Sequence, residues 1–298
     1  MSIIVQLAGG LGNQMFQYAA ARAVSHRLQL PLKLDISRLQ KSKTRTYQLH
    51  HFSIIEDFAT EKDLQMYSSI EEKSGLIISA IKKVKHHLLP WYKQSVIEQR
   101  GYHYHEDFHR IKKSCYLKGY WQSENYFKMI EHLIRDDFRI KKETDAQNRE
   151  LINQISGTES VSVHIRRGDY VENPVTKKNH GILGLTYYER AAEYISKKVD
   201  NPAFFIFSDD TEWVKQHFRP TFLYTVINHN RAEDVHEDLR LMSCCKHHII
   251  ANSTFSWWGA WLSGNENKQI TAPVNWFTDQ VMKSRGELYI IPESWKQL

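Results

Sequence analysis

The order of apolar and polar positions along the chain predicts an α/β fold. Near the N-terminus, an apolar run at residues 3–7 leads into a glycine-rich turn, and apolar residues at helical spacing then follow from 13 to 30. Asn13 is a favourable N-cap residue and marks the expected start of this helix. Residues 31–35 form a second expected strand. Together these segments predict a β–turn–α–β unit of the doubly wound kind.

The second half of the chain alternates strand and helix patterns, whereas the region from 36 to 150 is irregular. The pattern predicts strands at 161–166, 203–207, 222–227 and 247–251, and helices at 186–198, 211–218, 234–245 and 256–263. A polar run at 143–150 separates the two halves. We therefore expect two Rossmann-like domains that face a cleft, 1–153 and 154–298. Whether the C-terminal segment packs back on the first domain stays open.

Composition and charge narrow the class of protein only in part. The 298 residues are 41% hydrophobic and 25% charged, which is ordinary for a soluble globular protein. No apolar run approaches the ~20 residues that span a bilayer, and the N-terminus enters a strand without the features of a signal peptide. We therefore expect a cytoplasmic protein, or one on the cytoplasmic face of the membrane. The net charge of +6 suits a small anionic ligand, nucleic acid or an acidic membrane.

Three local features have competing interpretations. The chain has three cysteines without CxxC spacing, and we expect them to be reduced, with Cys244 and Cys245 in the core. Residues 75–93 form a basic amphipathic stretch, which is either a solvated helix face, the favoured interpretation, or a contact with an anionic membrane. The histidine-rich run at 103–109 is similar to the ligand run of metal hydrolases, but Phe108 occupies a ligand position. We therefore expect no metal site there.

The strand expected at 161–166 ends in a charged cluster. The residues in this segment are His164, Ile165, Arg166, Arg167, Gly168 and Asp169. In an open α/β sheet, ligands bind at the carboxyl ends of the strands. An arginine at that position suits phosphate oxygens, because the guanidinium group presents a planar fork of donors and keeps its charge. The segment therefore predicts a site for a phosphorylated ligand.

Two neighbouring strands also end in polar residues. The strand at 203–207 is followed by Asp209 and Asp210. Ser208 or Asp209 is expected to cap the next helix, which leaves a carboxylate for the N–H groups of guanine or for a sugar hydroxyl. The strand at 247–251 is followed by Asn252, Ser253, Thr254, Phe255 and Ser256. These open a helix whose N-terminal amides and hydroxyls suit an anion. Three strand ends therefore present phosphate-compatible groups at one edge of the sheet.

The turn near the N-terminus contains Gly10, Gly12, Asn13, Gln14 and Met15. A dinucleotide fingerprint requires a small residue where Met15 stands, so a nicotinamide cofactor is disfavoured. Two interpretations remain. Either the glycines serve only the backbone geometry, or the turn brings backbone amides and the Asn13 and Gln14 side chains close to a ligand.

Four stretches of the chain together resemble the glycosyltransferase family that contains the α-1,2-fucosyltransferases, and in particular its bacterial members. They are GGLGNQMFQY at 9–18, GYWQSE at 119–124, HIRRGDY at 164–170 and NSTFSWWGAWL at 252–262. The resemblance implies a GT-B fold, GDP-fucose as donor, inversion at the anomeric carbon, and neither a required metal nor another cofactor. The lack of a DxD motif at Asp209 and Asp210 agrees with the last point.

The resemblance also implies roles for single residues. Arg166 would stabilise the charge on the β-phosphate, and Asn13 would contact the donor sugar or the incoming hydroxyl, so these two are the expected catalytic residues. The backbone of His164 and one of the two aspartates would hold guanine. The implied donor-binding set is Gly10, Gly12, Asn13, His164, Arg166, Asp209, Asp210, Asn252, Ser253, Thr254, Phe255 and Ser256. Arg167 and Asp169 are expected to form a buried pair that supports the loop.

The catalytic base is left unassigned, with Glu124, His164 and Asp169 as candidates. The implied acceptor is a galactose-terminated oligosaccharide or lipid-linked glycan of an O-antigen or similar polysaccharide, with peripheral membrane contact left open. A binding module without chemistry is disfavoured because all four motifs are intact. Nucleic acid is disfavoured because the charge is spread and the basic stretches lack a reader motif.

Overall fold

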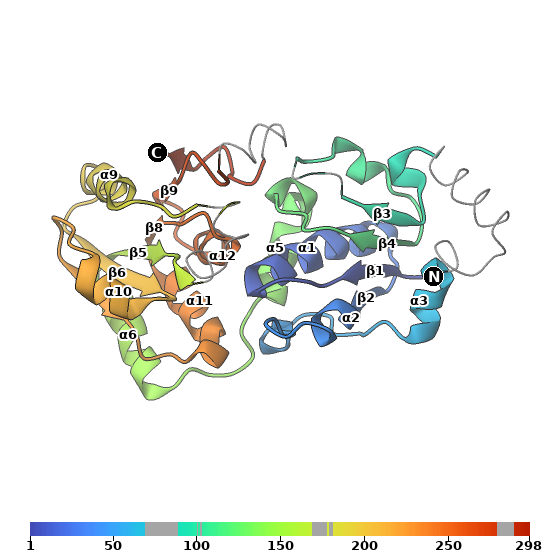
Figure 1. The fold of residues 1–298 in the computed structure, drawn as a ribbon, viewed down its shortest axis with the longest axis horizontal. Coiled ribbons are helices and arrows are strands. Elements are labelled where there is room, and N and C mark those ends of the chain that lie inside the picture. The colour runs from blue at the N-terminus through green and yellow to red at the C-terminus, as the bar shows by residue number, and fades with distance from the viewer. Residues whose placement is uncertain (69–88, 100, 102, 169–177, 179–180, 279–288) are drawn as a thin grey trace. The chain divides into compact units, whose positions relative to one another are not determined.

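The computed structural model describes residues 1–68, 89–99, 101, 103–168, 178, 181–278 and 289–298. These residues form two compact units, each built on one parallel sheet (Figure 1). The first unit comprises Met1–Lys141 and the short segment Glu287–Ile290, and the second comprises Lys142–Gly286 and Ile291–Leu298. The C-terminal part of the chain thus returns once to the first unit before it ends in the second.

The division between the units lies before the polar run at 143–150, whereas the boundary expected after residue 153 falls inside helix α6 (Ala146–Ser156). The helix starts within that run because Asp145 caps it, accepting a hydrogen bond from the backbone N–H of Asn148 at 2.8 Å. Ile155 of α6 belongs to the core of the second unit. The polar run is therefore mainly the start of a helix and not a linker.

The first unit contains a four-stranded parallel sheet in the order β2-β1-β4-β3. Its strands are β1 (Ile3–Gln6), β2 (Leu32–Asp35), β3 (Val96–Glu98) and β4 (Cys115–Lys118). Its α-helices are α1 (Leu11–Leu28), α2 (Ser37–Gln40), α3 (Glu61–Ser68) and α5 (Glu131–Asp137), and its 3₁₀ turns are η1 (Leu49–His51), η2 (Trp91–Lys93), η3 (Glu106–Arg110), η4 (Glu124–Tyr126) and η5 (Lys128–Ile130). Most residues of α1 are buried, and they include the polar side chains of Gln14 and Gln17 as well as apolar ones, so its sequence is not amphipathic.

Helix α1 begins earlier than Asn13. Gly10 is the N-cap residue, and its carbonyl accepts the backbone N–H groups of Asn13 and Gln14 at 3.0 and 3.1 Å. Gly9 has a φ of +78°, and a Cβ atom there would lie 2.6 Å from the side-chain nitrogen of Asn13. The prediction that Asn13 caps this helix is therefore wrong. The chain turns at the two glycines, and the Asn13 side chain projects from the first turn of the helix.

The second unit contains a six-stranded parallel sheet in the order β10-β9-β8-β5-β6-β7. Its strands are β5 (Glu159–Ile165), β6 (Pro202–Ser208), β7 (Tyr224–Ile227), β8 (His247–Ile249), β9 (Ile270–Ala272) and β10 (Lys296–Gln297). Its further helices are α9 (Leu185–Ser196), α10 (Thr211–His217), η6 (Ala232–Asp234), α11 (Val235–Cys244) and α12 (Thr254–Leu262). Counted within the unit, this is the Rossmann order 3-2-1-4-5-6, whose switch point lies between β5 and β8.

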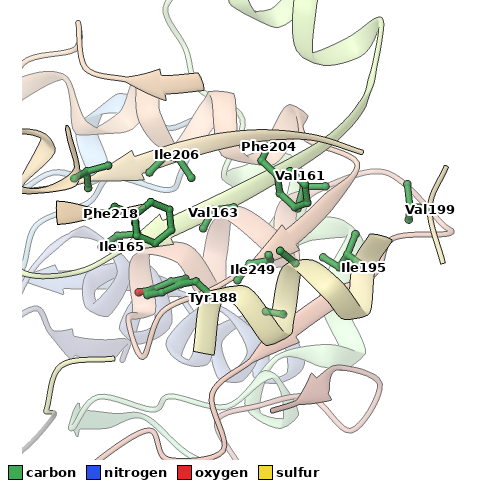
Figure 2. Packing of buried hydrophobic residues seen from close by; sticks show 13 residues of the cluster. Val161, Val163, Ile165, Tyr188, Ile195, Val199, Phe204, Ile206, Phe218 and Ile249 are labelled. Atoms are coloured by element: carbon green, nitrogen blue, oxygen red, sulfur yellow. The ribbon is translucent and has the colours of Figure 1, made fainter. Parts of the chain in front are cut away.

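Both faces of this sheet are covered by helices, with α9 and α6 on opposite sides (Figure 1). Along β6, Phe204 and Ile206 join a cluster with residues of β5, α9 and α10 (Figure 2). Phe205 and Phe207 join a second cluster with residues of α6 and α11. Burial on both faces explains why this strand is a continuous apolar run in the sequence. The predicted α/β class with parallel sheets is confirmed.

The elements predicted for the second half agree with the structure to within two residues at each end, although β9 and β10 were not predicted. Cys115, Cys244 and Cys245 form no disulfide, as expected. Among the described residues, no helix is both long enough and apolar enough to cross a membrane. Most of the basic stretch 75–93 lies outside the described residues.

Candidate active site

Arg166 follows the last residue of β5, next to the switch point of the second sheet. Its Nη1 atom lies 3.0 Å from Oδ2 of Asp209, and both side chains are about three-quarters buried, with exposed fractions of 22% and 24%. The other oxygen of Asp209 accepts the backbone N–H of Arg167 at 2.8 Å. One carboxylate therefore fixes both the loop after β5 and the direction of the Arg166 guanidinium group.

The neighbouring carboxylate, that of Asp210, caps a helix. Asp210 is the N-cap of α10 and accepts the backbone N–H of Trp213 at 3.0 Å, while the Ser208 hydroxyl accepts the N–H of Asp210 at 3.0 Å. The prediction that Ser208 or Asp209 caps this helix is therefore wrong, because Asp210 does so. Asp209 does not cap the helix, and its carboxylate instead contacts Arg166 and the backbone N–H of Arg167 in the loop after β5.

Arg167 also has partners that the sequence did not indicate. Its guanidinium carbon lies 3.6 Å from the centroid of the Trp213 ring, a cation–π contact, and its Nε atom lies 3.6 Å from Oδ2 of Asp210. These contacts tie the loop after β5 to the start of α10. The expected partner Asp169 lies outside the described residues. Trp213 stands three positions after the capping aspartate, and only that spacing could have pointed to it.

His164, near the end of β5, is buried. Burial, and secondarily the charge of Arg166, lower the pKa of His164 to about 3. The imidazole is therefore neutral at physiological pH and is too weak a base to take a proton from a hydroxyl group efficiently. Its Nδ1 atom has no hydrogen-bond partner among the described residues, and its ring centroid lies 5.7 Å from that of Phe255. His164 is therefore disfavoured as the catalytic base.

The N-terminal turn of α12 lies beside the end of β5. Strands β5 and β8 are parallel neighbours with Val163 opposite Ile249, so the chain leaves both strands at similar levels. Ser253 is the N-cap residue, and its hydroxyl makes no capping hydrogen bond within the described part of the chain. Its carbonyl accepts the Ser256 hydroxyl at 3.2 Å, and the Asn252 amide donates to the carbonyl of Trp276 at 3.3 Å.

These contacts combine two positive features at one switch point. Arg166 contributes a fixed full charge, and the first turn of α12, which includes Thr254 and Phe255, contributes the positive end of a helix dipole. The contact between the rings of His164 and Phe255 shows that this turn reaches the end of β5. The arrangement suits a ligand with a negatively charged group such as a diphosphate.

In the first unit, the glycine-rich turn meets the GYWQSE stretch. Oδ1 of Asn13 accepts a hydrogen bond from Nε2 of Gln122 at 2.8 Å. The buried Gln14 side chain instead binds backbone groups. It donates hydrogen bonds to the carbonyls of Gly9 and Thr46 and accepts one from the N–H of Gln48. The interpretation that Gln14 contacts a ligand is therefore disfavoured.

Gly10 and Gly12, two further expected donor-binding residues, belong to the backbone of the same glycine-rich turn. Arg45 also lies at this turn, and the sequence did not predict it. Gly10 is the helix cap and Gly12 is buried in the first turn of α1. The guanidinium group of Arg45 lies close to Gly10, since a Cβ atom on that glycine would be 3.5 Å from Nη1. No pattern in residues 36–150 pointed to Arg45. Glu124, a candidate base, lies 3.4 Å from Nζ of Lys128.

No group of three or more histidine, cysteine or acidic side chains in the described ranges is arranged to hold a metal ion. In the run at 103–109, the rings of His103 and His105 are adjacent, with centroids 4.2 Å apart. His105 also stacks on Trp91 with centroids 4.6 Å apart. These imidazoles are therefore parts of an aromatic cluster.

The two α/β units, each with a parallel sheet, form a GT-B-like fold. The match of the family model to residues 2–297 shows that the chain belongs to glycosyl transferase family 11.

Two bacterial relatives match nearly the whole length of this chain, and a human relative matches half of it. An alpha-1,2-colitosyltransferase of Escherichia coli is 37% identical, with 100% of this chain and 99% of that protein covered. The O-antigen biosynthesis glycosyltransferase WbnK of Escherichia coli is 34% identical over 91% of this chain and 93% of that protein. Human galactoside alpha-(1,2)-fucosyltransferase 1 is 24% identical over 50% of this chain and 43% of that protein.

Among solved structures, a mutant of Arabidopsis thaliana FUT1 in complex with GDP has a similar fold. Its TM-score is 0.51, with 13% sequence identity and with 94% of this chain and 72% of that chain covered. At this identity the likeness concerns the fold alone.

Proposed function

We propose that the protein is an inverting fucosyltransferase. It moves L-fucose from GDP-β-L-fucose to the 2-hydroxyl group of a terminal β-galactoside and forms an α-1,2 linkage. In this proposal the second unit holds the donor and the first unit holds the acceptor. The names of the relatives, which include α-1,2-fucosyltransferases and an O-antigen enzyme, support this proposal and suggest a surface glycan as the acceptor.

The observation that carries the proposal is the position of Arg166. It stands at the carboxyl end of β5, beside the N-terminal turn of α12, and it is held by Asp209 at 3.0 Å. A guanidinium group in that place can bind two oxygens of a diphosphate through its fork of donors. The helix N-terminus adds backbone N–H groups for the same ligand.

The proposed reaction is a direct displacement at the anomeric carbon. The acceptor oxygen attacks the anomeric carbon from the face opposite the diphosphate, and the bond between that carbon and the β-phosphate oxygen breaks. The electron pair of the broken bond goes to the β-phosphate oxygen, and the acceptor hydroxyl gives its proton to a base, for which Glu124 and Asp169 are the candidates. Arg166 stabilises the charge that builds up on the leaving group, which is electrostatic catalysis by a preorganised donor. Asp209 positions Arg166 and contacts no reacting atom.

Asn13 and the candidate bases Glu124 and Asp169 have proposed roles on the acceptor side. Asn13 keeps its proposed contact with the donor sugar or the incoming hydroxyl, and Gln122 fixes its amide through a hydrogen bond of 2.8 Å. The low pKa of His164, about 3, leaves Glu124 and Asp169 as the candidate bases. Asp210 caps α10, so in this proposal the backbone of His164 and the carboxylate of Asp209 hold guanine.

Purified protein incubated with GDP-fucose and N-acetyllactosamine is expected to release GDP and to form an α-1,2-fucosylated product. The turnover should be unchanged after metal removal by EDTA, because Arg166 and the helix N-terminus supply the positive charge that a divalent ion supplies in other transferases. GDP release followed over time, with linkage analysis of the product, checks both statements. A product with another linkage, or activity that EDTA abolishes and Mg²⁺ restores, contradicts the corresponding part of the proposal.

Colitosyl transfer is a second candidate function. It is favoured by the 37% identity to an α-1,2-colitosyltransferase over the whole chain. Colitose is L-fucose without its 3-hydroxyl group, so the same site chemistry at the diphosphate serves both donors. The two candidates are separated by comparing kcat/KM for GDP-fucose and GDP-colitose with one acceptor. A site that hydrogen-bonds the 3-hydroxyl group strongly rejects the deoxy sugar.

The variant Gly168→Ala is expected to lower the transfer rate by about 10- to 100-fold. A Cβ atom at position 168 would lie 2.5 Å from Oδ2 and 3.1 Å from Cγ of Asp209. That carboxylate must move, and Arg166 then loses its support. Gly184→Ala is the matched control, since nothing lies within 4 Å of a Cβ atom there. Steady-state kinetics and thermal unfolding of both variants test this, and full activity of Gly168→Ala would show that Asp209 does not position Arg166.

A further inference from the structure

The first unit carries a pocket that the proposed transfer step does not use. It has a volume of about 400 Å³ and is lined by Trp91, Tyr104, His105, Glu106 and Asp107. The three ring-bearing side chains are partly buried, and the two carboxylates are exposed. Aromatic surface combined with a few polar groups is the usual composition of a small-molecule site.

The aromatic wall of this pocket is held in place by hydrogen bonds. Nε1 of Trp91 donates to the carbonyl of Glu98, the last residue of β3, at 2.8 Å. The ring of His105 stacks on that of Trp91 with centroids 4.6 Å apart, and the backbone N–H of His105 donates to the Tyr126 hydroxyl at 3.1 Å. Tyr104 packs edge-on against Tyr126 at 4.9 Å. The wall is therefore preorganised, which lowers the entropic cost of binding a ligand.

The pocket lies at the same edge of the first sheet as the glycine-rich turn. The side chain of Gln99, directly after β3, accepts the backbone N–H groups of Tyr120 and Trp121 at 2.9 and 2.8 Å. The ring of Trp121 lies 6.1 Å from that of Trp91. The next residue, Gln122, donates to Asn13. A continuous chain of contacts thus leads along this edge from Asn13 to the aromatic wall.

We propose that this pocket binds a sugar unit of the acceptor glycan beyond the galactose that receives the transferred residue, an inference that rests on the proposed function. The C–H groups of a pyranose ring carry partial positive charge and pack on the negative faces of aromatic rings. The carboxylates of Glu106 and Asp107 accept hydrogen bonds from sugar hydroxyl groups, and such bonds to ionised acceptors are strong. The pocket therefore selects for the length of the acceptor.

Three acceptors that share a terminal β-galactose test this inference: methyl β-D-galactopyranoside, N-acetyllactosamine and lacto-N-neotetraose. In the wild type, kcat/KM is expected to rise with acceptor length. Trp91→Ala is expected to lower kcat/KM for the tetrasaccharide about tenfold, while the values for the methyl galactoside and the KM for GDP-fucose stay unchanged. The ratio of kcat/KM for the long acceptor to kcat/KM for the short one is the decisive measurement, because general destabilisation of the protein does not change it.

A second variant covers the case in which Trp91→Ala fails to fold. The double change Glu106→Gln and Asp107→Asn alters exposed side chains, and it is expected to reduce the advantage of the tetrasaccharide about threefold or more. The matched control is Glu61→Gln, which removes an exposed carboxylate from the first turn of another helix in the same unit and should change nothing. A wild type indifferent to acceptor length, or folded variants that lose activity equally on all three acceptors, would overturn the inference.

Calorimetric binding of lacto-N-neotetraose in the presence of GDP separates this inference from the proposed function. If no acceptor is fucosylated, the proposed function fails, but tetrasaccharide binding that Trp91→Ala abolishes still supports the pocket. Equal binding by wild type and variant, or no binding by the wild type, counts against the pocket whatever the activity.

Discussion

Replacing Arg166 by alanine is expected to lower kcat for transfer by about 10²–10³-fold and to leave the protein folded. The guanidinium group carries a full positive charge at the switch point, and in the proposed reaction its effect is greatest when the β-phosphate leaves. The partner carboxylate tolerates the change, because Asp209 keeps the hydrogen bond from the backbone N–H of Arg167 and has an exposed fraction of 24%. Steady-state kinetics with GDP-fucose and thermal unfolding of the variant check the two expectations.

Two further variants control this experiment. Arg166→Lys keeps the charge but loses the planar fork, so its kcat should lie between those of wild type and the alanine variant. Arg190→Ala removes the same charge from an exposed position of α9 and should have no effect on transfer. A normally folded Arg166→Ala variant with wild-type turnover would show that the leaving group is stabilised elsewhere.

The sheet of the second unit could be predicted because its local signals agree with its tertiary structure. Strands β5 and β6 are buried and end in turn residues, so both their positions and their polar carboxyl ends were visible in the sequence. The parallel order then brings Arg166, Asp209 and the start of α12 to one edge. Strands β9 and β10 were missed because they have only three and two residues and because, unlike the equally short β8, neither is followed by a helix in the described part of the chain.

The division of roles between adjacent polar residues could not be predicted. Asp209 and Asp210 are chemically identical, and capping propensity does not choose between them. The choice depends on the loop after β5, where Gly168 allows the close approach of Asp209, and this contact is formed between segments about 40 residues apart. The same reason applies to Gln14, whose amide is used by backbone groups of residues 46–48.

The residues of the first unit near the proposed acceptor site could not be predicted for a different reason. Between residues 36 and 141 the described elements are short helices, 3₁₀ turns and short strands, none of which is long enough to show a reliable hydrophobic period. The pocket around Trp91 and the position of Arg45 beside Gly10 both come from this region. The role of these side chains depends on how they pack against the edge of the sheet, and a local sequence pattern does not show that packing.

The variant Asp238→Asn is expected to stabilise the protein at pH 8 by about 2–3 kcal/mol. Burial in the second unit raises the pKa of Asp238 from 3.8 to about 6, against the hydrogen bond of 2.7 Å from Asn230, which favours the charged form. The folded state therefore binds its proton more tightly than the unfolded chain does. The resulting stability is present below about pH 4 and is lost as the pH rises towards 6, so the wild type carries the cost of a buried charge at pH 8.

Asparagine at position 238 keeps an oxygen that can accept the Asn230 hydrogen bond but carries no charge at any pH. The gain from the substitution should be about 1.5 kcal/mol at pH 5 and about 3 kcal/mol at pH 8. Denaturant unfolding at the two pH values measures this, with Asp200→Asn, an exposed aspartate of the same unit, as the control that should show no such difference. Asp238 lies on α11, and α11 packs against α12, where a Cβ atom on Gly259 would come within 3.0 Å of Met242. A gain that is equal at both pH values would mean that Asp238 is already ionised at pH 5 in the folded protein.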